Sequence, residues 1–262
     1  MNYLQIKKMK QKIKSLRKKL ISGKPSIGSW IQIPSIDNVS ILSNAGYEWL
    51  TIDMEHGSFN IGDLPELIST IISNECIPLV RIPKMDEHYC KAALDAGALG
   101  LIIPMIKNSH EVELAIKYSC WPPKGTRGVG YSNSNLFGKY FDEYKYFTRN
   151  PLIVAQIENK EAYEDLDNIL KIKMLDAVMI GPYDLSYSLN NTADFDDPHF
   201  KNVIKMILLK SKKRKKACGI HIVSPDVKKL KKYVNDGFDL IAYSTDANFL
   251  IKNANNPLEQ QK

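Results

Sequence analysis

Short apolar runs recur along the chain at lengths typical of buried strands. They are Ile27–Ile33, Trp49–Ile52, Ile77–Val80, Leu99–Ile103, Leu152–Ile157, Ala177–Ile180, Ala217–Ile222 and Leu240–Ala242. Amphipathic stretches separate several of them, among them Ile61–Ile72, Ala162–Ile172 and Pro198–Lys210. Apolar strands that alternate with helices indicate a parallel sheet covered by helices, and eight repeats predict a closed (β/α)₈ barrel. A chain of 262 residues, 44% of them hydrophobic, can bury such a core as one domain.

Polar and ionisable side chains gather where several of the predicted strands end. They are Trp30 and Gln32, Asp53 with Glu55 and His56, Arg81, Gln156 with Glu158, and Asp184. In a barrel of this kind, residues just beyond consecutive strands converge on one rim, where active sites are found. The pattern therefore predicts an active site built from several strand ends.

Two acidic residues stand out because each follows an apolar run. Glu158 lies just past Leu152–Ile157, and Asp184 follows Ala177–Ile180. Carboxylate ligands suit Mg²⁺ or Mn²⁺ better than zinc, especially with positions left open for substrate oxygens. The residues alone leave a second interpretation open, in which both acids cap the helices that follow.

The remaining strand-end residues fit proton transfer and anion binding. A lone histidine such as His56 is more often a surface or satisfied residue, but Asp53, three residues earlier, is placed to hold its imidazole in one tautomer. Arg81 either pairs with a nearby carboxylate or, beside a divalent ion, receives an α-keto acid.

These residues lie in a series of ordered motifs that runs from Ser26 to Asp246. The motifs are GSWIQIPS, DMEHG, PLVRIP, ALDAGALGLIIPM, WPPKGTRGVG, QIENKEA and DAVMIGPYDLS. In order and spacing they resemble the HpcH/HpaI family of class II pyruvate-dependent aldolases. The resemblance implies a TIM barrel of the phosphoenolpyruvate/pyruvate type, usually assembled as a homohexamer.

The resemblance also implies residue roles. It assigns Glu158 and Asp184 to a divalent ion (Mg²⁺ or Mn²⁺, with Co²⁺ as a further option), His56 with Asp53 to acid/base chemistry, Arg81 to the pyruvyl oxygen, Gln156 to support of the metal site, Trp30, Gly181, Pro182 and Asn133 to substrate binding, and Asp95 to the neighbourhood of subunit contacts. The function expected is metal-dependent, reversible cleavage of a 4-hydroxy-2-keto acid to pyruvate and an aldehyde. Asn133 stands where relatives often carry an arginine, which predicts a preference for neutral or hydroxylated aldehydes.

Three alternatives stay open at this point. A class I aldolase would need an imine-forming lysine at a strand end, and the nearest candidate, Lys84, lies in a loop. A Mg²⁺-dependent acyl-CoA lyase of the malyl-CoA or citrate lyase type would share the metal carboxylates but not the histidine of DMEHG. A non-catalytic binding protein on the same barrel would use its basic N-terminal helix as the working surface.

The charge of the chain is localised. Residues 1–24 hold nine Lys or Arg and no acid, whereas the rest carries 27 basic against 29 acidic residues. Met9, Ile13, Leu16 and Leu20 recur at helical spacing in that segment, which predicts a basic amphipathic helix at 1–24, a barrel at 25–252 and a polar tail at 253–262. Binding of RNA or an anionic membrane by the basic face is the weaker interpretation. We expect no membrane span, and four scattered cysteines without metal-ligand spacing predict a cytoplasmic enzyme.

Overall fold

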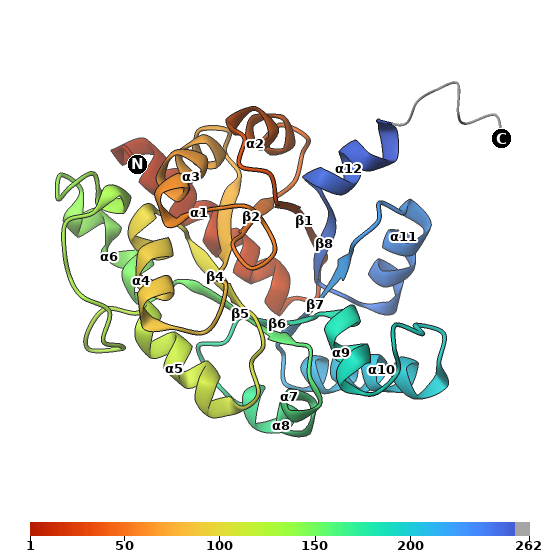
Figure 1. Cartoon of the computed structure of the whole chain (residues 1–262). Coiled ribbons are helices and arrows are strands. Elements are labelled where there is room, and N and C mark those ends of the chain that lie inside the picture. The colour runs from red at the N-terminus through yellow and green to blue at the C-terminus, as the bar shows by residue number, and fades with distance from the viewer. Residues whose placement is uncertain (255–262) are drawn as a thin grey trace.

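The computed structural model describes residues 1–254, and its centre is a closed barrel of parallel strands (Figure 1). In chain order the strands are β1 (Ser26–Ile31), β2 (Trp49–Asp53), β3 (Ile77–Arg81), β4 (Gly100–Ile103), β5 (Leu152–Ile157), β6 (Ala177–Ile180), β7 (Ala217–Ile222) and β8 (Leu240–Thr245). Each strand pairs with the next, and β8 pairs with β1 to close the barrel. The (β/α)₈ fold predicted from the apolar runs is confirmed.

Helices surround the barrel as an outer layer (Figure 1). They are α2 (Ile36–Ser43), α3 (Leu64–Ser73), α4 (Glu87–Ala96), α5 (Ser109–Ser119), α6 (Phe141–Arg149), α7 (Lys160–Glu164), α8 (Leu166–Ile169), α9 (Pro182–Ser188), α10 (Pro198–Lys213), α11 (Val227–Asp236) and α12 (Asp246–Asn253), with 3₁₀ turns η1 (Ile61–Asp63) and η2 (Asn133–Asn135). Many begin at a side-chain cap. The side chain of Asn108, for example, accepts a hydrogen bond from the N–H of Glu111.

The strands read as apolar runs because both of their faces are buried, one inside the barrel and one under the helices. The structure extends three of the runs by polar residues at their carboxyl ends, and one of these is β8, which continues through Ser244 and Thr245. β2 includes Asp53 and β3 includes Arg81, and these two residues are aligned as neighbours in the strand pairing. Hydrophobicity cannot predict this extension, because the backbone pairing continues where the side chains become polar.

Helix α1 (Tyr3–Ile21) packs one apolar face on the barrel, as its spacing predicts. The buried positions are Ile6, Met9, Ile13, Leu16 and Leu20. The helix lies against β1 and β3 and against helices α3 and α6. It therefore belongs to the hydrophobic core rather than to a separate appendage.

Part of the basic face of α1 is bound to the barrel itself. Arg17 donates to Asp176 at 2.7 Å and to the carbonyls of Asn150 and Pro151 at 3.0 and 2.9 Å, while Lys19 pairs with Glu48 at 2.6 Å. These contacts give the charges of α1 a structural role.

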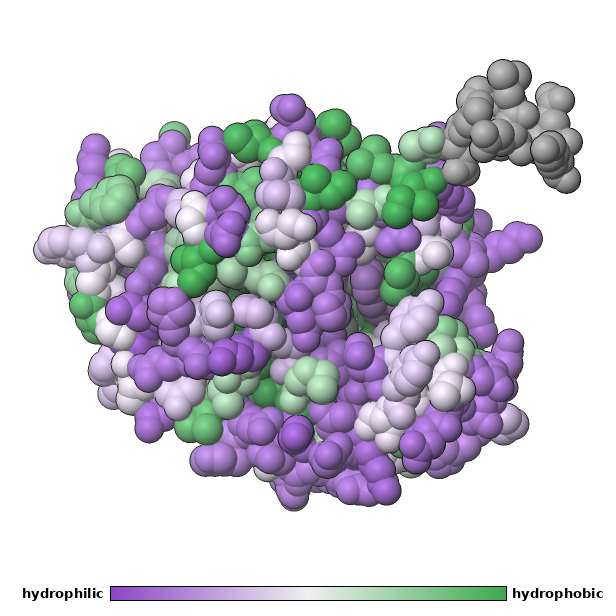
Figure 2. Space-filling model, in the orientation of Figure 1, coloured by the Kyte–Doolittle hydropathy of each residue, from purple (hydrophilic) through white to green (hydrophobic). Residues whose placement is uncertain are grey.

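Polar side chains cover most of the face shown in Figure 2, and apolar ones gather over α2 and α12. Within residues 1–254 we find no helix with the length and apolarity that crossing a membrane requires. From residue 255 on, the expected polar tail lies outside the described residues.

Candidate active site

The site rests on one layer of side chains inside the barrel. Alternate strands of a (β/α)₈ barrel contribute four inward side chains to each layer, and the stagger of the strands moves the layer two residues along for every two strands. Applied to the pairing register, this rule places in one layer Trp30 of β1, Arg81 of β3, Gln156 of β5 and His221 of β7. We call these four the floor layer. Above it, towards the carboxyl ends of the strands, lie Asp53 and Ser244.

Arg81 and Asp53 form a buried two-point pair at this level. Arg81 donates from Nε to Asp53 Oδ1 at 2.8 Å and from Nη2 to Oδ2 at 2.7 Å. Asp53 also accepts from the Gln32 side chain at 3.0 Å. Burial opposes ionisation of Asp53, but the hydrogen bonds and charge of Arg81 outweigh it and hold the pKa of that carboxyl below its usual range. The guanidinium is thus fixed in orientation before any substrate arrives.

Glu55 is a third member of this pair that the sequence analysis names without a role. Its Oε2 lies 2.7 Å from Arg81 Nη1, so each of the three guanidinium nitrogens faces a carboxylate. Burial raises the pKa of Glu55, against the opposing charges of Arg81 and His56. The positive charge of Arg81 therefore offsets part of the cost of burying the Glu55 carboxylate.

His56 differs from the expectation. Asp53 accepts from the backbone N–H of His56 at 3.3 Å, and in the described part of the chain no hydrogen bond joins its carboxylate to the imidazole. The oxygens of Asp53 are occupied by Arg81, Gln32 and backbone groups, so the expected control of the tautomer by Asp53 is not observed. The side chain of His56 is exposed at the rim beside Glu55.

Glu158 follows β5 at the carboxyl end of the barrel, which we call the mouth, and is almost fully buried, at 2% exposure. Its Oε1 accepts from the N–H of Met105 at 2.6 Å, and its Oε2 accepts from Gln156 Nε2 at 2.8 Å. Burial raises the pKa of Glu158 to about 7, and the negative charges of Glu55 and Asp184 push it the same way.

Glu158 and Asp184 are brought to one side of the mouth by β5, β6 and the start of α9. Gly181 follows β6, and a Cβ there would come within 2.3 Å of Glu158 Oε2, so the position requires glycine. Pro182 begins α9, and Asp184 lies exposed in its first turn. Residues 1–254 hold no cluster of three or more His, Cys, Asp or Glu arranged around an ion. Two carboxylates with open positions fit Mg²⁺ or Mn²⁺, which keep water or substrate oxygens as further ligands.

His221 is the floor residue that lies outside every motif of the family resemblance, although its place at the end of the seventh apolar run puts it at the rim. Its ring stacks on Trp30, with centroids 4.7 Å apart and planes 16° apart, and the carbon of the Arg81 guanidinium lies 4.1 Å from the centroid of a Trp30 ring. Trp30 is therefore packed between the arginine and the histidine. The signal that could have found His221 is its parity, because the floor residue of each odd strand lies at or near the strand end.

Two expected residues lie elsewhere. Asn133 belongs to η2, which packs on α4 and α6, and Ser134 next to it approaches the C-terminal end of α4 at Gly97. That is the end of the barrel where the strands begin, so this chain does not bring Asn133 to the mouth. Asp95 lies on α4, 3.8 Å from Nε of the buried Arg127.

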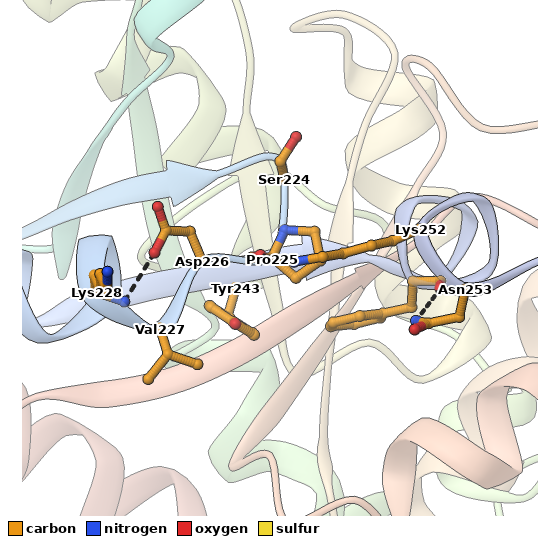
Figure 3. A pocket seen from close by; sticks show the side chains of 9 residues that line it. Ser224, Pro225, Asp226, Val227, Lys228, Tyr243, Lys252 and Asn253 are labelled. Atoms are coloured by element: carbon orange, nitrogen blue, oxygen red, sulfur yellow. Dashed lines mark hydrogen bonds between the residues drawn. The ribbon is translucent and has the colours of Figure 1, made fainter. Parts of the chain in front are cut away.

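A surface groove between the loop after β7 and helix α12 is unrelated to this cluster (Figure 3). Three of its polar side chains are bonded to nearby backbone: Asp226 caps α11, Lys252 donates to the Pro225 carbonyl at 2.7 Å, and Asn253 donates to the Phe249 carbonyl at 2.9 Å.

Comparisons with known proteins agree with this geometry. The family model described as HpcH/HpaI aldolase/citrate lyase matches residues 26–253. The chain is 30% identical over 237 residues to the 4-hydroxy-2-oxo-heptane-1,7-dioate aldolase of Klebsiella pneumoniae, covering 90% of this chain and 89% of that one. It is 29% identical over 227 residues to the hydroxypyruvate/pyruvate aldolase of Agrobacterium fabrum, covering 86% and 85%.

A solved structure shows the same fold along nearly the whole chain. The crystal structure of an HpcH/HpaI aldolase/citrate lyase family protein from Burkholderia cenocepacia superposes with a TM-score of 0.87 at 28% identity, covering 94% of this chain and 98% of that one. The matched region includes every strand of the barrel and all residues of the mouth. The chain therefore belongs to the HpcH/HpaI aldolase/citrate lyase family and is a carbon–carbon lyase.

Proposed function

We propose that this protein is a divalent-metal-dependent aldolase that reversibly cleaves a 4-hydroxy-2-keto acid into a 2-keto acid and an aldehyde. The observation that carries the proposal is the mouth itself, where a fixed guanidinium, Arg81, faces a buried carboxylate with a raised pKa, Glu158. This arrangement supplies one group that attracts a keto-acid oxygen and another whose charge invites a cation.

Glu158 and Asp184 would hold the ion. Mg²⁺ or Mn²⁺ is the expected occupant, because the donors are carboxylate oxygens and positions remain for substrate. When bound, the ion acts as a Lewis acid on the keto acid. Gln156 fixes Glu158 from below through its hydrogen bond to Oε2, and Gly181 keeps the space beside that oxygen free.

The chain's own residues divide the reaction between them. Arg81 orients the carboxylate or keto oxygen of the substrate and stabilises the enolate oxygen as its charge develops. His56, exposed at the rim, takes the proton from the C4 hydroxyl. The C3–C4 bond then breaks, its electron pair stays on the keto-acid fragment as the enolate, and the aldehyde leaves. A proton returned to C3 completes the 2-keto acid.

The names of the relatives indicate which substrates to test. Their names point to pyruvate or hydroxypyruvate as the keto acid and to 4-hydroxy-2-keto acids as the compounds cleaved. Lys84 is exposed in the loop after β3, which does not favour an imine-forming route. The four cysteines are buried free thiols, consistent with the expected cytoplasmic location.

In this proposal, the preference for one aldehyde over another depends on the assembly of several copies of the chain. Asn133 lies at the far end of the barrel, so its predicted effect on acidic aldehydes requires a second copy to bring η2 to the mouth. A homo-oligomer, hexameric by the family resemblance, would meet that condition. Light scattering gives the oligomeric state, and Asn133→Arg changes acceptor preference only in an assembled form.

The decisive experiment measures keto-acid release from a panel of 4-hydroxy-2-keto acids, with and without added Mg²⁺ or Mn²⁺. We expect turnover that chelation abolishes, and a loss of about a hundredfold or more in His56→Ala. His110→Ala, which alters an exposed histidine on α5, is the matched control. Full activity after exhaustive chelation, or borohydride trapping of a keto-acid adduct, would contradict the proposal.

A further inference from the structure

The floor layer is polar in a way that the mechanism above does not use. Among the residues the structure describes, three of its four members carry a buried polar atom without a hydrogen-bond partner: Trp30 Nε1, Gln156 Oε1 and His221 Nε2. Buried polar atoms are usually paired, so a group of unpaired ones at the bottom of an active site marks where a ligand or water binds.

Two of the four floor residues are already engaged in anchoring. Arg81 is held by Asp53 and Glu55, and Gln156 donates to Glu158. A keto acid bound through its carboxylate and keto oxygens lies between Arg81 on β3 and the carboxylates after β5 and β6. The rest of the floor lies outside these anchoring contacts. That half consists of Trp30 and His221.

The packing of Trp30 limits how these two residues can respond. Arg81 and His221 both stack on it, and its side chain is 1% exposed. A side chain packed on both sides cannot change rotamer without disturbing both neighbours. The indole N–H of Trp30 can only donate a hydrogen bond, so His221 is the member of this half that can offer a ring nitrogen as an acceptor.

The state of His221 decides what that partner is. Burial and the neighbouring Arg81 lower the pKa of His221 to about 4, and a hydrogen bond to the backbone of Ser244 opposes the shift. The imidazole is neutral at pH 7. Because a carbonyl oxygen accepts hydrogen bonds, the ring nitrogen that faces Ser244 carries the proton, and Nε2 is left as an acceptor. A hydroxyl group is the natural donor to such a nitrogen.

We propose that His221 recognises the substituent on C3 of the keto acid and favours keto-acid substrates that carry a hydroxyl group there. Hydroxypyruvate is the smallest such keto acid. This inference rests on the proposed function, since it takes the keto acid to bind between Arg81 and Glu158 with its third carbon towards His221. The hydroxyl would donate to Nε2 and satisfy an atom that has no partner in the chain described. A methyl group at the same place would leave Nε2 unsatisfied.

The test compares hydroxypyruvate with pyruvate in the native enzyme, His221→Leu and His221→Gln. With Mg²⁺ and one neutral aldehyde, the ratio of kcat/KM for the two donors is measured, and calorimetry gives their affinities without an aldehyde. We expect the ratio to fall about tenfold in His221→Leu, the equivalent of one hydrogen bond, and by less in His221→Gln, which keeps a polar group. His110→Leu is the matched control.

The outcomes separate this inference from the proposed function. A donor ratio that stays within about twofold of native in His221→Leu overturns the inference, because one neutral hydrogen bond changes an equilibrium by more. Absence of aldol turnover, together with a calorimetric preference for hydroxypyruvate that His221→Leu removes, overturns the proposed function and supports the inference. Failure of the native protein to bind either keto acid overturns both. Circular dichroism confirms that His221→Gln is folded should His221→Leu lose all binding.

Discussion

Two arginines are buried in this barrel, and they differ in the charges that compensate them. Arg81, 5% exposed, faces a carboxylate oxygen at each of its three nitrogens, with separations of 2.7 to 2.8 Å. Arg127, 1% exposed, donates from Nη1 to the carbonyl of Ser119 at 3.1 Å, and its nearest carboxylate, Asp95, is 3.8 Å away. Both guanidinium groups are buried. The positive charge of Arg81 has more than one carboxylate beside it, whereas the positive charge of Arg127 has no carboxylate within hydrogen-bonding distance among the described residues.

The excess of acid at the mouth is what distinguishes a functional site from a structural one. Besides Asp53 and Glu55, the carboxylates of Glu158 and Asp184 lie at the same space. After burial, the negative charges of Glu55 and Asp184 help to raise the pKa of Glu158, and those of Asp53 and Asp184 help to raise the pKa of Glu55. Around Arg127, by contrast, Nε and Nη2 have no hydrogen-bond partner within residues 1–254, and burial lowers the pKa of the guanidinium. Surplus negative charge is unfavourable in a protein core unless a cation is to be bound there.

The largest expected effect is on turnover after Arg81→Ala. Removing the guanidinium removes the group that we propose to stabilise the enolate, and leaves Asp53 and Glu55 as buried carboxylates without their cation. We expect kcat to fall about a thousandfold. Arg81→Lys should recover little, because an ammonium group cannot reproduce the two-point contact with Asp53. Steady-state kinetics of keto-acid release measures both variants.

Arg214→Ala removes an exposed arginine from the C-terminal end of α10 and serves as the control. Near-native turnover in Arg81→Ala would contradict the distinction between the two arginines, because Arg81 would then be a structural residue like Arg127.

The second effect concerns stability when each arginine loses an acid. Asp53 is fully buried and bonded to Arg81 at two points, so Asp53→Ala should cost about 3–5 kcal/mol of unfolding free energy. The side chain of Asp95 is 28% exposed and 3.8 Å from Arg127, so Asp95→Ala should cost about 1 kcal/mol or less. Urea unfolding of the two variants measures the difference. Equal costs would mean that Arg127 depends on Asp95 as strongly as Arg81 depends on Asp53.

The same contrast shows what the sequence could predict. The strands, the alternation with helices and the buried face of α1 follow from periodicity, because burial on a repeating geometry leaves a repeating pattern. The gathering of Asp53, Arg81 and Glu158 follows from their places at strand ends.

Other contacts could not be predicted from order along the chain. The pairing of Glu55 with Arg81 depends on side-chain direction in a turn, and so does the exposure of the His56 imidazole. Asn133 follows the WPPKGTRGVG motif by three residues, yet its loop follows α5 to the end of the barrel where strands begin. Motif order carries no information about which end of the barrel a loop occupies.

The third prediction uses the raised pKa of Glu158 in the metal-free protein. A carboxyl with a pKa raised from 4.5 to about 7 binds its proton more tightly when folded than when unfolded. Its contribution to stability is therefore complete below about pH 4.5 and is lost as the pH rises through 7. Glu158→Gln removes this dependence, so the variant should gain about 3 kcal/mol relative to native between pH 4 and pH 8.

Urea unfolding of both proteins at the two pH values, without metal, measures the gain. Mg²⁺ added at pH 8 should stabilise the native protein and have little effect on Glu158→Gln. Glu164→Gln, an exposed residue on α7, is the matched control. Parallel pH profiles for native and Glu158→Gln would show that the mouth does not carry the surplus charge we assign to it.

The smallest expected effect is that of Arg127→Met. Methionine fills a similar volume, removes two nitrogens that have no hydrogen-bond partner in the described chain, and gives up the bond to Ser119. Replacement of a poorly compensated buried charge by an apolar side chain is commonly neutral or stabilising, so we expect a change within about 1 kcal/mol and native kcat/KM. Chemical unfolding and donor kinetics on the same preparation measure both. A loss of several kcal/mol would mean that Nε and Nη2 have partners outside the single chain, and a second copy packed against α4 would then be the first place to look for them.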